Sequence, residues 1–277
     1  MTTSSLPRAH TIVGASGAPV FVHEQGDGTP VLLLGGLGDA HDAWAFQLKG
    51  ELPRSHRLIA PDNRGTGSSP LPPDGTSIPA MAQDAAAVLR ALDAGPAHVA
   101  GFSGGGAIAQ ELALRDPELV RSLVLVGTWC RPDAHLRALG LTLLALMEHA
   151  PPDVFLEVLL RWVYTDRAHE DGRVAAWLDE ALAGPPPAPE GLVQYLRSAL
   201  EHDTADALRS VGVPALVIHG DADPIFAPDC ARELAARLPR ARLEILAGES
   251  HQPFQEVPER FDALVGAFLR EVEEAER

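Results

Sequence analysis

The chain has 277 residues, of which 46% are hydrophobic and 22% are charged, and its 22 basic and 38 acidic side chains give a formal net charge of −16. This much apolar material can form one large domain, or one domain that carries a sizeable insertion. An acidic surface repels phosphate backbones and anionic lipids, so we expect neither a nucleic-acid partner nor a membrane partner. The composition leaves a homo-oligomer open.

The two cysteines, Cys130 and Cys230, form no CxxC pair, so the sequence predicts neither a disulfide framework nor a zinc site. Residues 1–14 lack the basic and then apolar pattern of a secretory signal. The longest apolar run, residues 139–147, is too short to cross a bilayer. We therefore expect a cytoplasmic protein, and its preference for arginine over lysine favours a bacterial source.

The first elements in chain order are strand-like. Residues 18–25 alternate apolar and polar side chains, which predicts an edge strand in an antiparallel pair. Strands buried on both faces of a parallel sheet are predicted from the short, continuous apolar runs 31–35, 57–62, 98–102, 123–127 and 215–220. Helical stretches alternate with these runs at 41–52, 79–93, 105–115 and 229–238, and a strand at 243–247 and a helix at 258–274 follow. This alternation predicts an α/β fold with a doubly wound, mostly parallel sheet.

Residues 129–208 interrupt the alternation because they contain no strand-like run. They predict three or four helices separated by proline-rich breaks at 151–152 and 184–189. Strands of the core type resume at residue 215, so the segment is an insertion rather than a separate domain on a linker. We expect residues 1–128 and 209–277 to form the core, with 129–208 as a helical cap.

The residues Gly101-Phe102-Ser103-Gly104-Gly105 form a G-x-S-x-G motif between a strand-like run and a helical stretch. In that setting the serine lies on a tight turn that lifts its hydroxyl above the sheet. Only small residues fit two positions before and two positions after the serine, because these positions nearly touch. The motif alone is weak, but this context favours a nucleophilic Ser103 over an accidental glycine-rich turn.

Residues 104–109 also satisfy G-x-G-x-x-A, a fingerprint of dinucleotide binding. That motif needs an acidic residue about 20 positions later, at the end of the next strand. Here Thr128 and Trp129 follow that strand, which argues against a dinucleotide. The sequence has no P-loop, no HExxH and no calcium-loop pattern, so we expect neither a cofactor nor a metal site.

A nucleophilic serine needs a histidine base, and after this kind of turn the chain order is Ser, Asp or Glu, His. Of the 11 histidines, only His251 follows a late strand, on a loop that leads into the last helix. It is expected at the carboxyl edge of the sheet, where Ser103 also emerges. His219 lies inside a strand and is expected to pack in the core. We therefore predict that His251 is the base rather than a solvated loop histidine.

Two aspartates compete for the role of acid, because the loop after the strand 215–220 contains both Asp221 and Asp223. Asp223 precedes Pro224, which favours an extended backbone and fixes the direction of the side chain. Asp221 follows the strand directly and could instead shape the turn. These features favour Asp223 and leave Asp221 as the alternative.

A tetrahedral oxyanion needs backbone N–H donors. We predict Gly104, which follows the nucleophile, and Leu37, in the glycine-rich loop 35–38. An ordinary glycine-rich turn is an equal alternative for that loop. We expect Gly36, Phe102, Trp129 and Trp162 to contact substrate. Trp129 begins the insertion and is the best single candidate for a pocket wall, whereas Trp162 and Tyr164 could equally be core residues of the cap.

Together these residues resemble the α/β-hydrolase fold superfamily over nearly the whole chain. The matching segments are 35–44, 61–69, 101–105, 220–228 and 248–261, and their order is more specific than any one of them. The resemblance implies Ser103 as nucleophile, Asp223 as acid, His251 as base, and Leu37 and Gly104 as oxyanion donors. Within the superfamily the chain looks like bacterial enol-lactone hydrolases, carboxylesterases and cofactor-free haloperoxidase-like enzymes.

Two positions depart from the family pattern. The oxyanion loop begins Gly35-Gly36 where these families usually have His-Gly, so a bracing side chain is missing. Ser250 precedes the base where a glycine is usual. Neither departure removes a reacting group, and a serine nucleophile argues against dehalogenases and epoxide hydrolases, whose relatives have aspartate there.

The sequence therefore predicts a cytoplasmic serine hydrolase that cleaves an ester or lactone of a small apolar molecule through an acyl-enzyme, without a cofactor. Alternative reactions with the same triad are C–C bond hydrolysis, thioester cleavage and polyketide tailoring. An alternative of another class is a hydrolase-fold protein that binds a small ligand without turning it over. An intact set of Ser, Asp and His argues against that last possibility.

Overall fold

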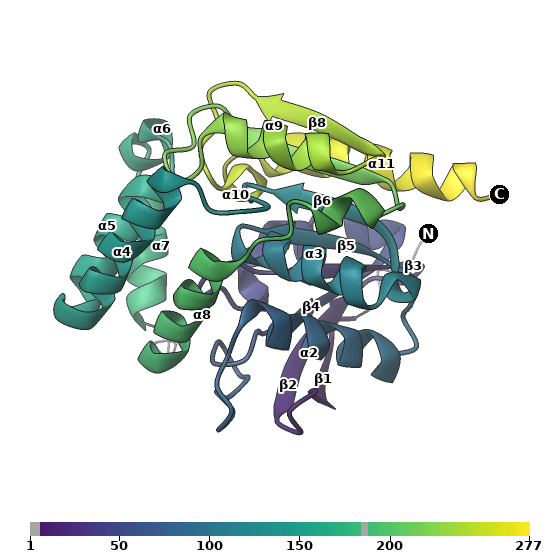
Figure 1. Cartoon of the computed structure of the whole chain (residues 1–277), viewed down its shortest axis with the longest axis horizontal. Coiled ribbons are helices and arrows are strands. Elements are labelled where there is room, and N and C mark those ends of the chain that lie inside the picture. The colour runs from purple at the N-terminus through teal and green to yellow at the C-terminus, as the bar shows by residue number, and fades with distance from the viewer. Residues whose placement is uncertain (1–5, 184–187) are drawn as a thin grey trace.

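The computed structural model of the protein describes residues 6–183 and 188–277. An eight-stranded sheet with the order β1-β2-β4-β3-β5-β6-β7-β8 forms its centre (Figure 1). β2 pairs antiparallel with β1 and β4, and the remaining neighbours pair in parallel, as the sequence predicts. The strands are β1 (Arg8–Val13), β2 (Pro19–Gln25), β3 (Thr29–Leu34), β4 (His56–Pro61), β5 (Ala97–Phe102), β6 (Val120–Val126), β7 (Ala215–Gly220) and β8 (Ala241–Leu246).

The inner parallel strands are apolar throughout because both faces of the sheet are covered. In β3, Leu32 and Leu34 belong to one apolar core, whereas Val31 and Leu33 belong to the other. This period of two is what a pleated strand imposes on neighbouring side chains. The first face is covered by α2 (Ile78–Ala91), α3 (Gly104–Arg115) and α9 (Pro228–Arg237), and the second by α1 (Ala45–Lys49), α10 (Pro253–Glu256) and α11 (Pro258–Ala275).

Two predicted elements are wrong in detail. The strand over 18–25 is not at the edge, since β1 lies outside β2. β1 alternates half-buried and exposed residues and has no apolar run that would reveal it. The helix predicted over 41–52 is instead short α1 between 3₁₀ turns at His41–Trp44 and Leu52–Arg54. Gly50 ends α1, and Pro53 cannot continue an α-helix.

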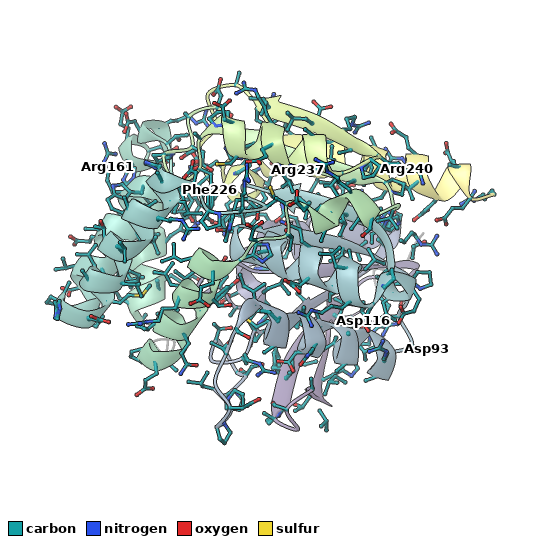
Figure 2. All side chains as sticks on the ribbon, viewed as in Figure 1. Asp93, Asp116, Arg161, Phe226, Arg237 and Arg240 are labelled. Carbon is teal, nitrogen blue, oxygen red and sulfur yellow. The ribbon has the colours of Figure 1, made fainter. Side chains whose placement is uncertain are left out.

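Between β6 and β7 the chain forms five α-helices within the described residues, where the sequence predicts three or four. They are α4 (Ala134–His149), α5 (Pro152–Val163), α6 (Asp166–Glu170), α7 (Arg173–Ala183) and α8 (Pro189–Glu201). Of the predicted break at 184–189, residues 184–187 lie outside the described residues. In Figure 2, Arg161 marks the outer side of this insertion and Phe226 lies where it meets the sheet, whereas Asp93 and Asp116 lie at the opposite end.

The strand order reverses at β3, because β4 pairs with one side of β3 and β5 with the other. Segments that leave the carboxyl ends of such strands diverge, which opens a crevice at that edge of the sheet. The loop that starts at Gly35 follows β3, and Ser103 follows β5. The fold therefore places the predicted nucleophile and oxyanion loop at this crevice. None of the helices that the structure describes has the length and hydropathy needed to span a membrane.

Candidate active site

Ser103 lies on the turn from β5 to α3 with φ +53° and ψ −120°, a conformation that is rare for a residue with a side chain. Its N–H donates to the carbonyl oxygen of Val126 over 2.9 Å. Its own carbonyl oxygen accepts a hydrogen bond from the Thr128 hydroxyl over 2.7 Å. β6 and the loop after it therefore hold the strained turn in place. Strained backbone conformations of this kind cluster at functional sites.

Glycines two residues before and after Ser103 are required by the close approach of backbone. A Cβ atom on Gly101 would lie 2.3 Å from the carbonyl oxygen of Gly105. A Cβ atom on Gly105 would lie 2.2 Å from the carbonyl oxygen of Leu34, at the end of β3. Any larger residue at either position would open the turn and move the serine.

His251 and Asp223 form a buried pair. His251 Nδ1 lies 2.8 Å from Asp223 Oδ2, and the two residues are 3% and 6% exposed. Asp223 Oδ1 accepts hydrogen bonds from the N–H groups of Ile225 and Phe226 over 2.8 and 3.1 Å. Burial would raise the pKa of Asp223, but the charge and hydrogen bond of His251 hold it below its usual value. Asp223 is therefore an ionised carboxylate, which can orient the imidazole.

The alternative acid, Asp221, lies elsewhere in the same loop. Its exposed carboxylate accepts a hydrogen bond from the N–H of Gly248 over 2.6 Å. Asp221 therefore connects the loop after β7 to the loop that leads to His251, and it is Asp223 that contacts the base.

Two aromatic rings flank the imidazole of His251. The ring of Phe102 lies 4.8 Å from it and the ring of Phe226 lies 5.3 Å from it, centre to centre. Phe102 is predicted to contact substrate, but it is not among the residues that line the cavity beside Ser103. The structure thus places Phe102 behind the base, where it supports the imidazole ring.

The loop after β3 brings Leu37 to the nucleophile. Leu37 and Gly104 line the same cavity as Ser103, and a Cβ atom on Gly36 would lie 3.1 Å from Ser103 Cβ. The N–H of Gly104 starts α3 and so has no acceptor within that helix. Gly36 supports the loop rather than facing substrate, because its N–H donates to the carboxylate of Asp39 over 2.8 Å.

Two side chains that the sequence does not single out brace this loop. Asp39 binds the N–H of Gly36, and Asn63 Nδ2 donates to the carbonyl oxygen of Gly35 over 3.1 Å. The loop is therefore held by side chains although Gly35 itself has none. Burial raises the pKa of Asp39 to about 6, although the hydrogen bond from Gly36 lowers it. The sequence signal for the bracing role of Asp39 is the position of this carboxylate at the end of the glycine-rich run 35–39.

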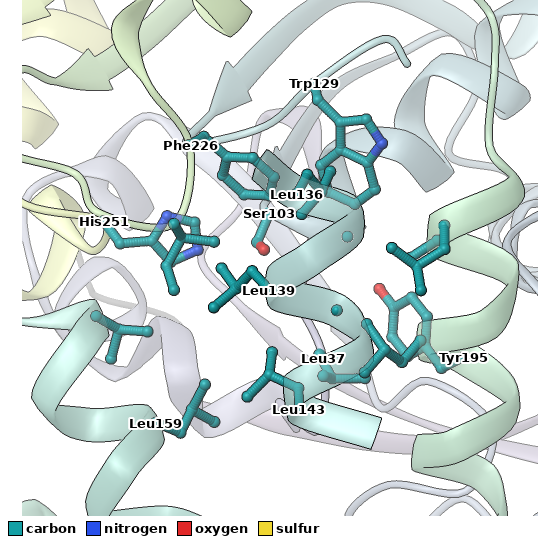
Figure 3. Close-up of a pocket in the computed structure, with 17 residues that line it drawn as sticks. Leu37, Ser103, Trp129, Leu136, Leu139, Leu143, Leu159, Tyr195, Phe226 and His251 are labelled. Carbon is teal, nitrogen blue, oxygen red and sulfur yellow. The ribbon is translucent and has the colours of Figure 1, made fainter. Parts of the chain in front are cut away.

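Ser103 and His251 open onto a cavity of about 70 Å³ between the sheet edge and the insertion (Figure 3). Trp129 lines it as predicted, and its indole stacks on Phe226 with ring centres 4.9 Å apart. The remaining wall is almost wholly apolar. It consists of Leu136, Leu139, Gly140, Leu143, Leu159, Val163, Tyr195, Leu196, Ala199, Leu200 and Ile225.

Trp162 does not reach this cavity, contrary to its prediction as a substrate contact. Leu159 and Val163 on α5 both line the cavity, whereas Trp162, about 100° around the helix from Val163, is not among the lining residues. Trp162 lines a separate groove beside Tyr164. The phenol of Tyr164 is buried and donates to Gln252 over 3.2 Å, which makes Tyr164 a core residue at the join with the sheet.

Metal ligands do not gather anywhere in the described part of the chain, where no group of three or more His, Cys, Asp or Glu side chains could hold an ion. The geometry instead unites a serine on a strained turn, a histidine bound to a buried carboxylate, and the N–H of Gly104 at the start of α3. This arrangement can perform nucleophilic attack on a carbonyl group.

Comparison with known proteins gives the same class. The sequence pattern of the alpha/beta hydrolase fold matches residues 29–257. The chain is 35% identical over 234 residues to "Putative carbamate hydrolase RutD" of Variovorax paradoxus, covering 83% of this chain and 87% of that protein. It is 31% identical over 254 residues to "Putative non-heme bromoperoxidase BpoC" of Mycobacterium tuberculosis, covering 90% and 97%. A thermophilic esterase from Thermogutta terrifontis superposes with a TM-score of 0.85 at 26% identity, covering 96% and 99%.

The fold and the site thus define a hydrolase built on a mostly parallel, doubly wound sheet. The chain belongs to the α/β-hydrolase fold family.

Proposed function

We propose that this protein is a serine hydrolase that cleaves carboxylic esters or lactones with a compact apolar acyl group. The observation that carries the proposal is the shared cavity, which Ser103 and His251 both line and whose wall is apolar; Asp223 binds His251 from behind. The likeness to an esterase from Thermogutta terrifontis supports the same reaction.

In the proposed reaction Ser103 Oγ attacks the carbonyl carbon while His251 Nε2 takes the hydroxyl proton. Asp223, at His251 Nδ1, holds the tautomer that leaves Nε2 free to accept it. The N–H groups of Leu37 and Gly104 bind the oxyanion. His251 returns the proton to the leaving alkoxide, and water then hydrolyses the acyl-enzyme by the same steps in reverse order, releasing the carboxylic acid.

The lining also bears on the choice of substrate. None of the described residues that line the cavity is a lysine or an arginine. A substrate that carries its own carboxylate would therefore lose its hydration without gaining an ionic partner. An acyl group made of carbon and hydrogen suits this wall best.

A carbamate is the second candidate substrate, and it is favoured by the relatives named carbamate hydrolase at 29–35% identity. Its reacting carbonyl carries nitrogen as well as oxygen, and the same attack by Ser103 would form a carbamoyl-enzyme. Because the reacting groups are shared, only turnover can separate the two.

The test uses p-nitrophenyl esters from acetate to octanoate, a set of lactones, thioesters and a p-nitrophenyl N-alkylcarbamate, together with a fluorophosphonate probe. We expect wild type to hydrolyse the shorter esters and to be labelled by the probe. Ser103→Ala should lose labelling and about 10⁴–10⁶-fold in kcat, and His251→Ala should lose nearly as much, because the triad acts as a unit. Equal labelling of wild type and Ser103→Ala would refute the proposal, and preferred turnover of the carbamate would select the second candidate.

A further inference from the structure

Tyr195 places a polar atom in a cavity wall that is otherwise almost wholly carbon. The residue lies on α8 of the insertion and is 3% exposed. In Figure 3 its phenol oxygen points from α8 toward the side of the cavity where Ser103 lies. Among the described residues that oxygen has no hydrogen-bond partner.

A buried hydroxyl without a partner lowers the stability of the folded protein. Phenylalanine would fill the same volume without that cost, so packing does not explain the hydroxyl. Tyr164, the other tyrosine, shows the usual arrangement, since its phenol donates to Gln252 and Gln255. The contrast suggests that the partner of Tyr195 is a molecule that enters the cavity.

The position of the phenol identifies the part of the substrate that it would meet. A Cβ atom on Gly104 would lie only 2.3 Å from Tyr195 Oη. The phenol thus occupies the space of the missing side chain next to the Gly104 N–H, the predicted oxyanion donor. The glycine at 104 therefore makes room for a hydroxyl brought from another element.

We propose that the Tyr195 hydroxyl donates a hydrogen bond to the carbonyl oxygen of the substrate, as a third oxyanion donor supplied by the insertion. The inference rests on the proposed function, because it assumes attack by Ser103 on a carbonyl group. Burial, and after it the charge of Asp39, raises the pKa of Tyr195 well above its usual value. The phenol accordingly stays protonated and remains a donor at the pH values where the base is active.

The test compares Tyr195→Phe with Tyr164→Phe, which each remove one phenol oxygen from a buried tyrosine. Tyr195→Phe should lower kcat about 10²–10³-fold, the usual loss for one oxyanion donor, with KM changed less than about threefold. Its Tm should equal or exceed that of wild type, because an unpaired buried hydroxyl has gone. Tyr164→Phe should show the opposite pattern, with a lower Tm and kcat/KM within about threefold of wild type.

A transition-state analogue separates the proposed role from ground-state recognition. Binding of a trifluoromethyl ketone to Tyr195→Phe should weaken by about the same factor as kcat/KM falls. A raised KM with unchanged kcat would mean that the phenol binds another substrate atom and would overturn the inference, as would unchanged kinetics. The proposed function fails by a different result, namely retained activity or probe labelling in Ser103→Ala, so the two failures are distinguishable.

Discussion

The sheet edge and the helical insertion border the same cavity, but they are held by different forces. At the edge, each reacting group is fixed by hydrogen bonds from other segments: Ser103 by Val126, and His251 by Asp223. The insertion contributes mainly leucine side chains, from α4, α5 and α8. Their apolar packing does not depend on the direction of any hydrogen bond. An isosteric change should therefore be severe at the edge and mild among the leucines of the insertion, where side-chain volume matters more than chemistry. The Tyr195 hydroxyl on α8 is the exception.

The largest effect is expected from an isosteric change at the edge. Asp223→Asn should lower kcat about 10⁴-fold, because the amide stabilises the wrong tautomer of His251. Asp221→Asn has the same change in charge and should stay within a few-fold of wild type, since the Asp221 carboxylate binds the Gly248 N–H and the base is bound by Asp223. Steady-state kinetics on a p-nitrophenyl ester measure both. A larger loss in Asp221→Asn would give Asp221 the role of acid.

The chemistry of the sheet edge also explains which residues of the site can be predicted from the sequence. The triad positions follow from the sequence because the chemistry demands particular residue types, in a fixed order, after particular strands. Asp39 and Asn63 escape prediction because a loop can be braced from many positions, and only the folded backbone shows which side chain reaches it.

In the insertion, composition predicts helices but not their rotation. Trp162 and Val163 are adjacent and both apolar, yet only Val163 lines the cavity. The unpaired phenol of Tyr195 is likewise a tertiary property, because nothing in its neighbouring residues distinguishes it from a core tyrosine. The edge strand β1 is not predicted because one of its faces is exposed and the other only half-buried, so its sequence has no apolar run.

A smaller effect on substrate preference is expected from replacing two tryptophans of the insertion. Trp129 and Trp162 differ in whether they line the cavity, so their variants can be compared directly. Trp129→Ala should enlarge the cavity and shift the preferred acyl chain of the substrate to a longer one. The change in relative kcat/KM between chains should be about 1–3 kcal/mol per methylene contact at most. Trp162→Ala is the matched control, because Trp162 lines a separate groove.

Both tryptophan variants should have a lower Tm, since each removes a large packed side chain. Only Trp129→Ala should change the ranking of acetate, butyrate, hexanoate and octanoate esters. An unchanged ranking in a folded, probe-labelled Trp129→Ala protein would show that Trp129 only packs the insertion onto Phe226.

The smallest expected effect is on stability: Asp39, in the oxyanion loop, should make the free energy of unfolding depend on pH. Its pKa is raised by burial from 3.8 to about 6, so the folded state binds a proton more tightly than the unfolded state. This contribution to stability is complete below about pH 4 and is lost as the pH rises through about 6. The shift corresponds to at most about 3 kcal/mol, and the partial exposure of the side chain reduces the expected loss to about 1–2 kcal/mol.

Asp39→Asn should remove this dependence, because the amide is neutral at every pH and its oxygen can still accept from the Gly36 N–H. The free energy of unfolding, measured with urea from pH 3.5 to 7.5, should therefore fall for wild type relative to Asp39→Asn between about pH 4 and pH 6. Asp262, whose pKa burial also raises to about 6, is present in both proteins and cancels in the difference. The exposed Asp179 on α7 supplies the control, since Asp179→Asn should run parallel to wild type. Parallel curves for wild type and Asp39→Asn would mean that the loop tolerates the charged carboxylate, and that the Gly36 N–H and solvent compensate for its burial.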